Sequence, residues 1–327
     1  MRDFSYLRAT SADAARQAAA LPGTMLLAGG TTLIDLAKCG VAEPDTLVDI
    51  THLKGLDRID VNERGATIGA LAKMGHVADH ADIKSRFPAI SEALWQAASA
   101  QIRNMATIGG NLMQRTRCPY FRDPVNFAAC NKRKPGSGCS AIGGVTRGHA
   151  VLGTSEACIA MYPGDLATAL VAFDATVHLG ERKLLVDDFF LLPGTTPDRE
   201  HAIEPGEMIT AIAIPGSAAA RRSTYLKIRD RQSYEFAAAS AAVGIEFEAD
   251  GRTIRDLRIA LGGVATKPWR VRAVEDALKG KALEPETVRA ASLLAVEGAV
   301  DHGANHYKIE LAPRVVARAI LKLGETA

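Results

Sequence analysis

Hydrophobic and polar positions divide the chain into short periodic segments separated by glycine-rich turns. Short apolar runs and period-two alternation predict strands at residues 25–27, 47–50, 59–61, 67–70, 176–179, 209–214, 224–228, 241–247 and 254–261. Apolar residues at helical spacing predict helices that begin at residue 33 and that span 88–98, 166–173, 270–278, 286–297 and 308–323. Runs of strands followed by runs of helices indicate an α+β fold.

The periodicity stops between about residues 115 and 150, where the chain is rich in Pro, Gly, Asn and Arg. So long a stretch without a period in a compact domain is normally functional or disordered, and three cysteines inside it favour function. A second Pro- and Gly-bearing stretch at residues 189–201 is typical of a connection. We place the domain boundary near residue 180, which gives a first domain of residues 1–180 and a second of residues 181–327.

Composition and charge remove several classes of function. With 327 residues, 47% of them hydrophobic and 23% charged, the chain is long enough for two well-buried globular domains. Its net charge of +2, from 39 basic and 37 acidic residues, gives no field that would attract nucleic acid. We also expect no export signal and no membrane span in this chain, because its first residues carry no apolar core and no long apolar run follows.

Two glycine pairs are candidate phosphate-binding turns. The first is the Ala-Gly-Gly-Thr-Thr-Leu sequence at residues 28–33, and the second is Thr-Ile-Gly-Gly-Asn at residues 107–111. Consecutive unhindered backbone N–H groups in such turns can bind phosphate oxygens, and a following helix would add its positive end. Neither GxGxxG nor GxxxxGK[ST] is present, so a Rossmann or P-loop site has no support. Two ordinary tight turns remain the alternative, because glycine serves positive-φ positions in many loops.

Four of the five cysteines lie close together in the sequence, with the spacing C-x11-C-x8-C-x18-C: Cys118, Cys130, Cys139 and Cys158. Without an export signal, clustered cysteines favour a metal over disulfides. Four thiolates suit a [4Fe–4S] cluster or a tetrahedral zinc ion, and incidental buried thiols are the remaining alternative. His149 could replace one ligand, although we interpret it as a surface histidine in a loop. The fifth, Cys39, is interpreted as a small core residue of the first helix.

No catalytic residues for an organic substrate are identifiable. The sequence contains no nucleophile elbow, no HExxH motif and no paired-carboxylate arrangement. Tyr225, Lys227, Arg229 and Arg231 alternate along a predicted strand, which we interpret as one solvated face.

Five motifs then carry a family resemblance: the two glycine sequences, Pro-Gly-Asp at 163–165, Glu-Pro-Gly-Glu at 204–207 and the Tyr-Leu-Lys-Ile-Arg-Asp-Arg sequence at 225–231. In order and spacing they resemble the FAD-binding medium subunits of the xanthine dehydrogenase and molybdenum hydroxylase family. The resemblance implies a two-lobed FAD domain of the vanillyl-alcohol oxidase type. An α+β C-terminal domain of the carbon monoxide dehydrogenase flavoprotein type would follow it.

The chain departs from that family by one insertion, at about residues 112–160, which contains all four clustered cysteines. Its sequences RTRCPYF, CNKR and GSGC resemble the flavoprotein subunits of periplasmic aldehyde oxidoreductases, which carry an extra [4Fe–4S] cluster. Reductase subunits that act on 4-hydroxybenzoyl-CoA are a more distant case. The resemblance thus implies that Cys118, Cys130, Cys139 and Cys158 ligate a [4Fe–4S] cluster.

Carried over residue by residue, the resemblance also implies an FAD site. The first turn would hold the pyrophosphate, Thr107 and Asn111 would hold further phosphate and ribose, and Asp165 would bind the adenosine side. Lys227 would lie near the flavin ring, with Ile203 or Ile209 packed on its face. The full set of implied FAD-binding residues is Leu26, Leu27, Ala28, Gly29, Gly30, Thr31, Thr32, Leu33, Thr107, Gly110, Asn111, Asp165, Ile203, Ile209 and Lys227.

The implied function is electron transfer within a heterotrimer or its dimer. Electrons would leave an aldehyde at a molybdenum cofactor on a large subunit, pass two [2Fe–2S] clusters on a small subunit, and reach FAD here before an external acceptor. Alternatives are the flavin subunit of another molybdenum hydroxylase, acting on purines, N-heterocycles or aromatic acyl-CoA, a self-contained flavin oxidase, and a zinc-stabilised module. The compartment would be the cytoplasm, or the periplasm if a partner carries the export signal.

Overall fold

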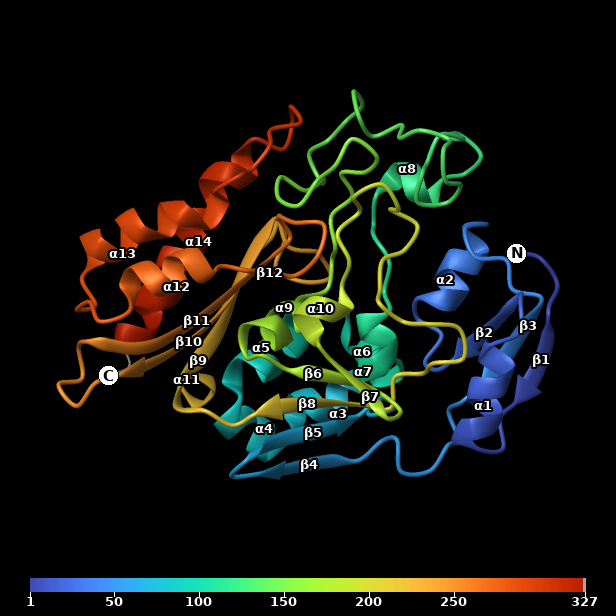
Figure 1. Ribbon diagram of the computed structural model, residues 1–327, viewed down its shortest axis with the longest axis horizontal. Helices are drawn as coiled ribbons and strands as arrows, with labels where there is room; N and C mark the ends of the chain where they lie inside the picture. Colours follow the sequence, from blue (N-terminus) through green and yellow to red (C-terminus); the bar gives the residue numbers. More distant parts are fainter. Residues whose placement is uncertain (326–327) are drawn as a thin grey trace.

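The computed structural model describes residues 1–325, which form three sheets with helices packed around them (Figure 1). The N-terminal lobe is a parallel sheet with the strand order β1-β3-β2. Ser11 caps the first helix by accepting a hydrogen bond from the Ala14 N–H at 3.1 Å. The elements of this lobe are β1 (Ser5–Arg8), α1 (Ala12–Ala19), β2 (Thr24–Leu27), α2 (Leu33–Lys38) and β3 (Thr46–Asp49).

The second lobe is an antiparallel sheet with the strand order β4-β5-β8-β6-β7 and a set of short helices. Its strands are β4 (Ile59–Asn62), β5 (Gly65–Gly69), β6 (Thr176–Leu179), β7 (Arg182–Leu185) and β8 (Ala211–Pro215). Its helices are α3 (Met74–Asp79), α4 (Ala81–Arg86), α5 (Pro88–Gln96), α6 (Ala100–Met105), α7 (Ile108–Leu112), α9 (Asp165–Ala172) and α10 (Val186–Phe189). Because β8 pairs with both β5 and β6, this sheet continues well past residue 180. The topology therefore favours a domain boundary after β8, and not near residue 180.

The C-terminal domain is a four-stranded antiparallel sheet with the order β12-β11-β10-β9. Its strands are β9 (Ser223–Ile228), β10 (Ala239–Phe247), β11 (Ile254–Gly262) and β12 (Trp269–Arg270), and its helices are α11 (Ala218–Arg221), α12 (Arg272–Leu278), α13 (Pro285–Ser292) and α14 (Tyr307–Glu325). Along β10, Ala241 and Val243 pack under the C-terminal helices, whereas Ala242 joins the core of the second lobe. Both faces of this sheet are therefore buried, and the two domains share a continuous interior.

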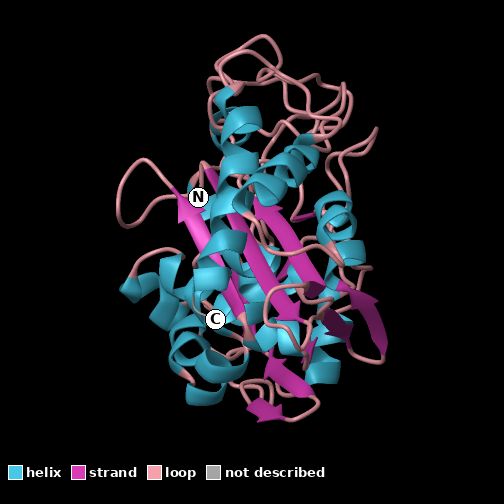
Figure 2. Cartoon of the chain, turned by 90° about the vertical axis from the view of Figure 1, so that its left-hand side faces the viewer, coloured by secondary structure: helices cyan, strands magenta, loops and turns pink. Residues whose placement is uncertain are grey.

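The segment at residues 112–160 has almost no regular structure, and its only helix within the described chain is α8 (Pro119–Arg122). Its loops gather at one end of the molecule (Figure 2). The segment is nevertheless tied to the rest of the fold. The Val151 N–H donates to the Val264 carbonyl at 2.8 Å, and the Thr146 hydroxyl donates to the His302 carbonyl at 2.8 Å. These bonds hold the loops against the C-terminal domain.

The α+β class is confirmed, and each predicted strand and helix has a counterpart in the structure. Several short elements were not predicted, namely β1, β7, β12, α1, α3, α4, α6, α7, α8, α10 and α11. Strand β1, for example, is exposed throughout its length and therefore lacks the alternation on which the sequence argument relied. The last expected helix before the C-terminal one is shorter, and a 3-10 turn (Leu293–Val296) follows it. Among residues 1–325, no helix is long and apolar enough to cross a membrane.

Candidate functional site

A cavity of about 200 Å³ lies where the two lobes, the inserted segment and the C-terminal domain meet. Two of its lining residues carry buried polar atoms without a partner in the described chain, namely the side-chain oxygen Oδ1 of Asn111 and the Nε of Arg117. Buried polar groups are normally hydrogen-bonded, so these orphaned atoms indicate that a polar ligand completes the cavity. The lining also includes Thr31, Thr32, Met74, Ala98, Gln114, Asp165, Tyr234 and Phe236.

The first glycine turn presents free backbone donors beside this cavity. Within residues 1–325, none of the four consecutive N–H groups from Gly29 to Thr32 donates to a protein acceptor. Gly30 has φ +72°, where L side chains are disfavoured, and the Thr32 side chain makes no capping bond to α2. A Cβ on Gly29 would lie 2.1 Å from the Met105 carbonyl oxygen, so only glycine lets the turn pack against the second lobe. The turn thus has the donors that a pyrophosphate needs.

The second glycine pair is not a turn, which corrects the interpretation made from the sequence. Gly109 and Gly110 lie in α7, whose first residue follows the N-cap Thr107. The Gly110 N–H donates to the Thr107 hydroxyl at 3.2 Å, and the Gly109 N–H donates to the Ala70 carbonyl at 2.8 Å. Both N–H groups are therefore used by the fold, and Asn111 is the residue of this motif that offers the cavity an unsatisfied atom.

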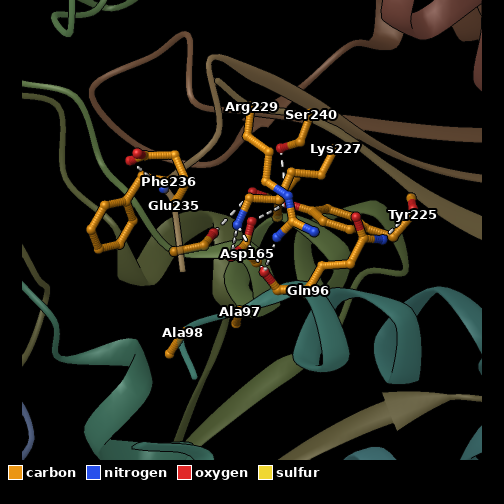
Figure 3. A network of polar contacts seen from close by, with 12 residues as sticks. Gln96, Ala97, Ala98, Asp165, Tyr225, Lys227, Arg229, Glu235, Phe236 and Ser240 are labelled. Atoms are coloured by element: carbon orange, nitrogen blue, oxygen red, sulfur yellow. Dashed lines mark hydrogen bonds and ion pairs between the residues drawn. The ribbon is translucent and has the colours of Figure 1, made fainter. Parts of the chain in front are cut away.

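Asp165 and Lys227, expected to bind opposite ends of the cofactor, form an ion pair (Figure 3). Lys227 Nζ lies 2.8 Å from Asp165 Oδ2, and the Tyr225 hydroxyl donates to Asp165 Oδ1 at 2.6 Å. Lys227 also donates to the Gln96 carbonyl at 3.0 Å. Burial raises the pKa of Asp165, while Lys227 opposes the shift. The network joins the first residue of α9 to β9 and to the end of α5.

Two consequences follow for residues of β9. Tyr225 and Lys227 are 2% and 7% exposed, so the interpretation of their alternation as a solvated face is wrong. The physical reason is that α5 and α9 cover this face of the sheet and supply a carboxylate and a carbonyl as partners. Asp165 lines the cavity, whereas Lys227 is not among its lining residues.

The remaining expected FAD residues surround the site less closely. Leu26, in β2, packs with the small core of the N-terminal lobe, and Leu33, at the start of α2, packs towards the inserted segment. Ile209 is buried in the core of the second lobe, and Ile203 packs against the same core. Neither isoleucine is among the residues that line the cavity.

Sequence reasoning missed two strained residues at the cavity. In the described chain three non-glycine residues have positive φ, and two of them line it, Ala98 at +49° and Tyr234 at +53°. Such backbone strain is concentrated at ligand sites, because the surrounding structure must enforce it. Neither alanine nor tyrosine favours this conformation, so no sequence signal could have identified them.

The four clustered cysteines line one small interior space of about 10 Å³ in the inserted segment. All are free thiols, and Cys130 and Cys139 face each other across an isolated antiparallel bridge. Burial raises the pKa of Cys118 to about 12 and also raises that of Cys158, so both are protonated unless a cation binds them. In residues 1–325 no three His, Cys, Asp or Glu side chains form a group that could hold a metal ion.

His149 lies in the inserted segment, and Cys39 lies beside it at the end of α2. His149 is 2% exposed, so the interpretation as a surface histidine is wrong. Its Nε2 lies 3.2 Å from Cys118 Sγ, and its Nδ1 has no partner in the described chain. Burial lowers the pKa of His149 to about 4, which makes the imidazole neutral. Cys39 is partly exposed and receives an Arg122 N–H at 3.5 Å, so it is not a simple core residue.

The inserted segment is also coupled to the first glycine turn through α2. Asp35 of α2 accepts hydrogen bonds from Arg117 at 3.0 Å and from Arg122 at 2.6 Å. Leu36 packs in the same cluster as Phe121 and Cys130. The helix that follows the glycine turn therefore rests directly on the cysteine-bearing loops.

Comparisons with known proteins identify the family. The chain matches the FAD-binding domain in molybdopterin dehydrogenase over residues 2–217 and the carbon monoxide dehydrogenase flavoprotein C-terminal domain over residues 224–323. It is 42% identical to the aldehyde oxidoreductase FAD-binding subunit PaoB of Escherichia coli K12, over 98% of each chain. This chain belongs to the FAD-binding medium subunits of the molybdenum hydroxylases. The first domain model ends after β8, in agreement with the sheet topology.

Two further relatives of this medium subunit extend the comparison. The glyceraldehyde dehydrogenase medium chain of Sulfolobus acidocaldarius is 29% identical, over 88% of this chain and 85% of its own. Among solved structures, carbon monoxide dehydrogenase from Hydrogenophaga pseudoflava matches with a TM-score of 0.75 and 26% identity, over 99% of this chain and 98% of that one. The two-domain flavoprotein architecture expected from the sequence is therefore confirmed.

Proposed function

We propose that this chain is the FAD- and [4Fe–4S]-carrying electron-transfer subunit of a molybdenum-dependent aldehyde oxidoreductase complex. Its partners would be a large subunit with the molybdenum cofactor and a small subunit with two [2Fe–2S] clusters, in a heterotrimer or its dimer. The observation that carries the proposal is the cavity at the junction of the lobes, with its orphaned Asn111 and Arg117 atoms and the free N–H groups of residues 29–32.

The chain's own residues fit FAD. The backbone from Gly29 to Thr32 would hold the pyrophosphate, because four N–H donors in sequence match an anion with several oxygens. Asn111 would accept a hydrogen bond from a cofactor hydroxyl, and Arg117 would donate one. FAD would supply the exchange between single electrons and electron pairs, which is the chemistry of the cofactor. The protein would bind it, orient it and exclude water from it.

Asp165 and Lys227 would act differently from the assignment made on resemblance. Each satisfies the charge of the other, so Lys227 has no free charge with which to stabilise an anionic ring. We propose that the pair holds α9 and β9 in register at the edge of the cavity, with Asp165 still able to accept from a cofactor hydroxyl. Ile203 and Ile209 would support the core behind the site.

The cluster assignment rests on the family resemblance and on the four cysteines that line one space, although within residues 1–325 they are not arranged as a group that could hold a metal ion. All four thiols surround a common space, and a [4Fe–4S] cluster holds its four thiolates around the iron–sulfide cube rather than at one point. Tetrahedral zinc would need the sulfurs to converge on a single ion. Arg117, which lines the FAD cavity, is the immediate neighbour of Cys118, so the route between the two centres is short in the chain. That proximity favours electron exchange between them.

The 42% identity to an aldehyde oxidoreductase subunit favours an aldehyde as the substrate of the complex. No residue of this chain is assigned a role in that oxidation. The partner composition and the compartment are proposed from the family resemblance alone, with export depending on a partner that carries the signal.

The proposal is tested by cofactor analysis of protein purified without air. We expect flavin absorption together with about four iron and four sulfide per chain, as a four-iron cluster requires. Flavin without iron would contradict the cluster assignment, and one zinc without iron would make the segment a structural metal site. Absence of flavin would contradict the assignment of the chain as an FAD-binding subunit.

A variant test addresses the FAD cavity itself. Asn111→Leu should weaken FAD binding about tenfold, since a buried hydrogen bond contributes about 1 kcal/mol and its loss leaves a cofactor group unpaired. The matched control is Asn62→Leu on the exposed edge strand β4, which should leave the Kd for FAD unchanged. Equal retention of FAD by both variants would contradict the assignment of the cavity.

A further inference from the structure

A second cleft adjoins the FAD cavity and has no role in the function proposed so far. Its volume is about 320 Å³, and it is enclosed by the inserted segment, the loop between β9 and β10, and the start of α14. Arg117, Glu235 and Phe236 line both spaces. In Figure 3, Glu235 and Phe236 lie near Asp165, which lines the FAD cavity. The Arg117 guanidinium lies over the Phe236 ring at 5.0 Å, so this stacked pair forms part of the wall between the cleft and the cavity.

The surface of this outer cleft is mainly apolar. Phe236 and Tyr307 contribute aromatic rings, the first from the loop after β9 and the second from the start of α14. Val145, which also lines the cleft, leaves 74% of its surface exposed. Ligand sites combine an apolar and aromatic lining with a small number of placed polar groups. The lining therefore suits a flat ring system.

Lys308 is a buried cation at the cleft. It is 1% exposed, and within residues 1–325 it forms no ion pair. Its Nζ donates to the Ala238 carbonyl at 3.1 Å and to the Gly263 carbonyl, and it lies 5.9 Å from the centre of the Tyr307 ring. An ammonium group has three N–H donors, so one remains after these two carbonyls. Because buried charges are normally compensated, this donor favours a ligand that brings an acceptor.

The acidic residues of the cleft are paired with other cations. Asp230 accepts two hydrogen bonds from Arg147, at 2.9 and 3.0 Å, and Glu235 lies 3.4 Å from Arg231. In the part of the chain that the structure describes, neither carboxylate contacts Lys308. The positive charge of Lys308 is therefore free to act on a bound molecule.

We propose that the outer cleft binds a quinone, whose ring packs against Phe236 and Tyr307 and whose carbonyl oxygen accepts the remaining N–H of Lys308. The quinone class fits because it joins a flat apolar ring to carbonyl acceptors and carries no charge that the apolar lining would desolvate. The inference rests on the proposed function and adds to it the chemical class of the external acceptor and the place where it binds.

The transfer between the two neighbouring sites is balanced without a further reactant. Return of the reduced cofactor, FADH2, to FAD releases two electrons and two protons. A quinone takes up both to become a hydroquinone, in which its two C=O groups are C–OH groups. Lys308 keeps its own proton and stabilises the negative charge that develops on the carbonyl oxygen during this transfer.

The test is isothermal titration calorimetry of duroquinone into the complete, FAD-loaded, oxidised protein. The methyl groups on every free ring carbon of duroquinone block addition of cysteine thiols. We expect Lys308→Met to raise the Kd about tenfold, because it removes a charged donor from a buried carbonyl oxygen. Tyr307→Leu should raise it about fivefold by removing an aromatic wall, and Tyr307→Phe should bind like the parent. Tyr307 is only partly buried, so its variants test the cleft even where Lys308→Met folds poorly.

Lys322→Met is the matched control, because Lys322 lies on the same helix and donates to Thr224 at 2.9 Å without lining the cleft. It should leave the Kd unchanged. No binding by the flavin-loaded parent, or an equal Kd in the parent, Lys308→Met and Tyr307→Leu, would overturn the inference while the FAD assignment stands. Reoxidation by a small iron–sulfur or haem protein, in a parent that does not bind duroquinone, would overturn it in favour of a protein acceptor. A parent without flavin would contradict the proposed function, whereas the Kd values would still report on the cleft.

Discussion

Replacing Lys227 by Met should destabilise the protein far more than the loss of an exposed ion pair would. Lys227 donates at 2.8 Å to Asp165 and at 3.0 Å to the Gln96 carbonyl, and both members of the pair are buried. Within residues 1–325, loss of the lysine leaves the Asp165 carboxylate the Tyr225 hydroxyl at 2.6 Å and the charge of Arg229 as compensating partners. Breaking a buried pair in this way costs about 3–5 kcal/mol.

The pH dependence of this loss has a definite sign. Burial already raises the pKa of Asp165 above its ordinary value of 3.8, and removing the lysine raises it further. An acid whose pKa is raised in the folded state does not lower the free energy of unfolding at a pH below its unfolded-state pKa. As the pH rises towards the folded-state pKa, it lowers the free energy of unfolding by an increasing amount. The deficit of Lys227→Met should therefore be largest at neutral pH and shrink towards about pH 4.

The assay is thermal unfolding followed by circular dichroism at one FAD concentration, with the Kd for FAD measured for each variant so that the ligand contribution RT ln(1 + [FAD]/Kd) can be subtracted. A loss of 3–5 kcal/mol corresponds to a fall in Tm on the order of 10 °C. The control is Lys84→Met, which breaks an exposed pair with Asp79 and should change Tm by only about 1–2 °C. The double variant Asp165→Asn with Lys227→Met removes both charges and should be more stable than Lys227→Met alone. A double variant as unstable as the sum of the two single variants would refute the reasoning.

Three further outcomes are expected. Gly30→Val and Gly110→Val should both lower the flavin content of purified protein. The φ of +72° at Gly30 excludes a β-branched residue, and a Cβ on Gly110 would lie 2.9 Å from the Thr107 hydroxyl. Full flavin retention in both variants would contradict this prediction. The isolated chain should not turn over aldehydes or purines in a dye-reduction assay, and a rate near that of a complete complex would be inconsistent with its role. Burial lowers the pKa of His201 to about 4 from 6.5, so the unfolded chain binds a proton that the folded one does not, and stability is lost as pH falls through this interval. His201→Gln should remove up to about 3 kcal/mol of that loss in urea unfolding curves at pH 7 and pH 4.

Local pattern was sufficient for much of the fold. Most strands and helices follow from apolar periodicity, because an element that buries one face must repeat its apolar residues at the spacing of that element. The first glycine turn was predicted for the same local reason, since Gly30 occupies a positive φ between β2 and α2. The prediction of a second glycine turn was wrong, because the sequence does not reveal that Thr107 caps a helix and accepts a hydrogen bond from the Gly110 N–H.

The sequence by itself determined the α+β class, the family, most of the longer strands and helices, and the first glycine turn. Only the tertiary structure decided which polar groups meet. Asp165 and Lys227 are separated by 62 positions and Cys118 and His149 by 31, yet each pair is in contact. A period of two or 3.6 residues reports the face of one element, whereas contacts between elements depend on how the sheets and the inserted loops pack. Because of that packing, Lys227, expected on a solvated face, forms a buried ion pair, and His149, expected at the surface, contacts Cys118.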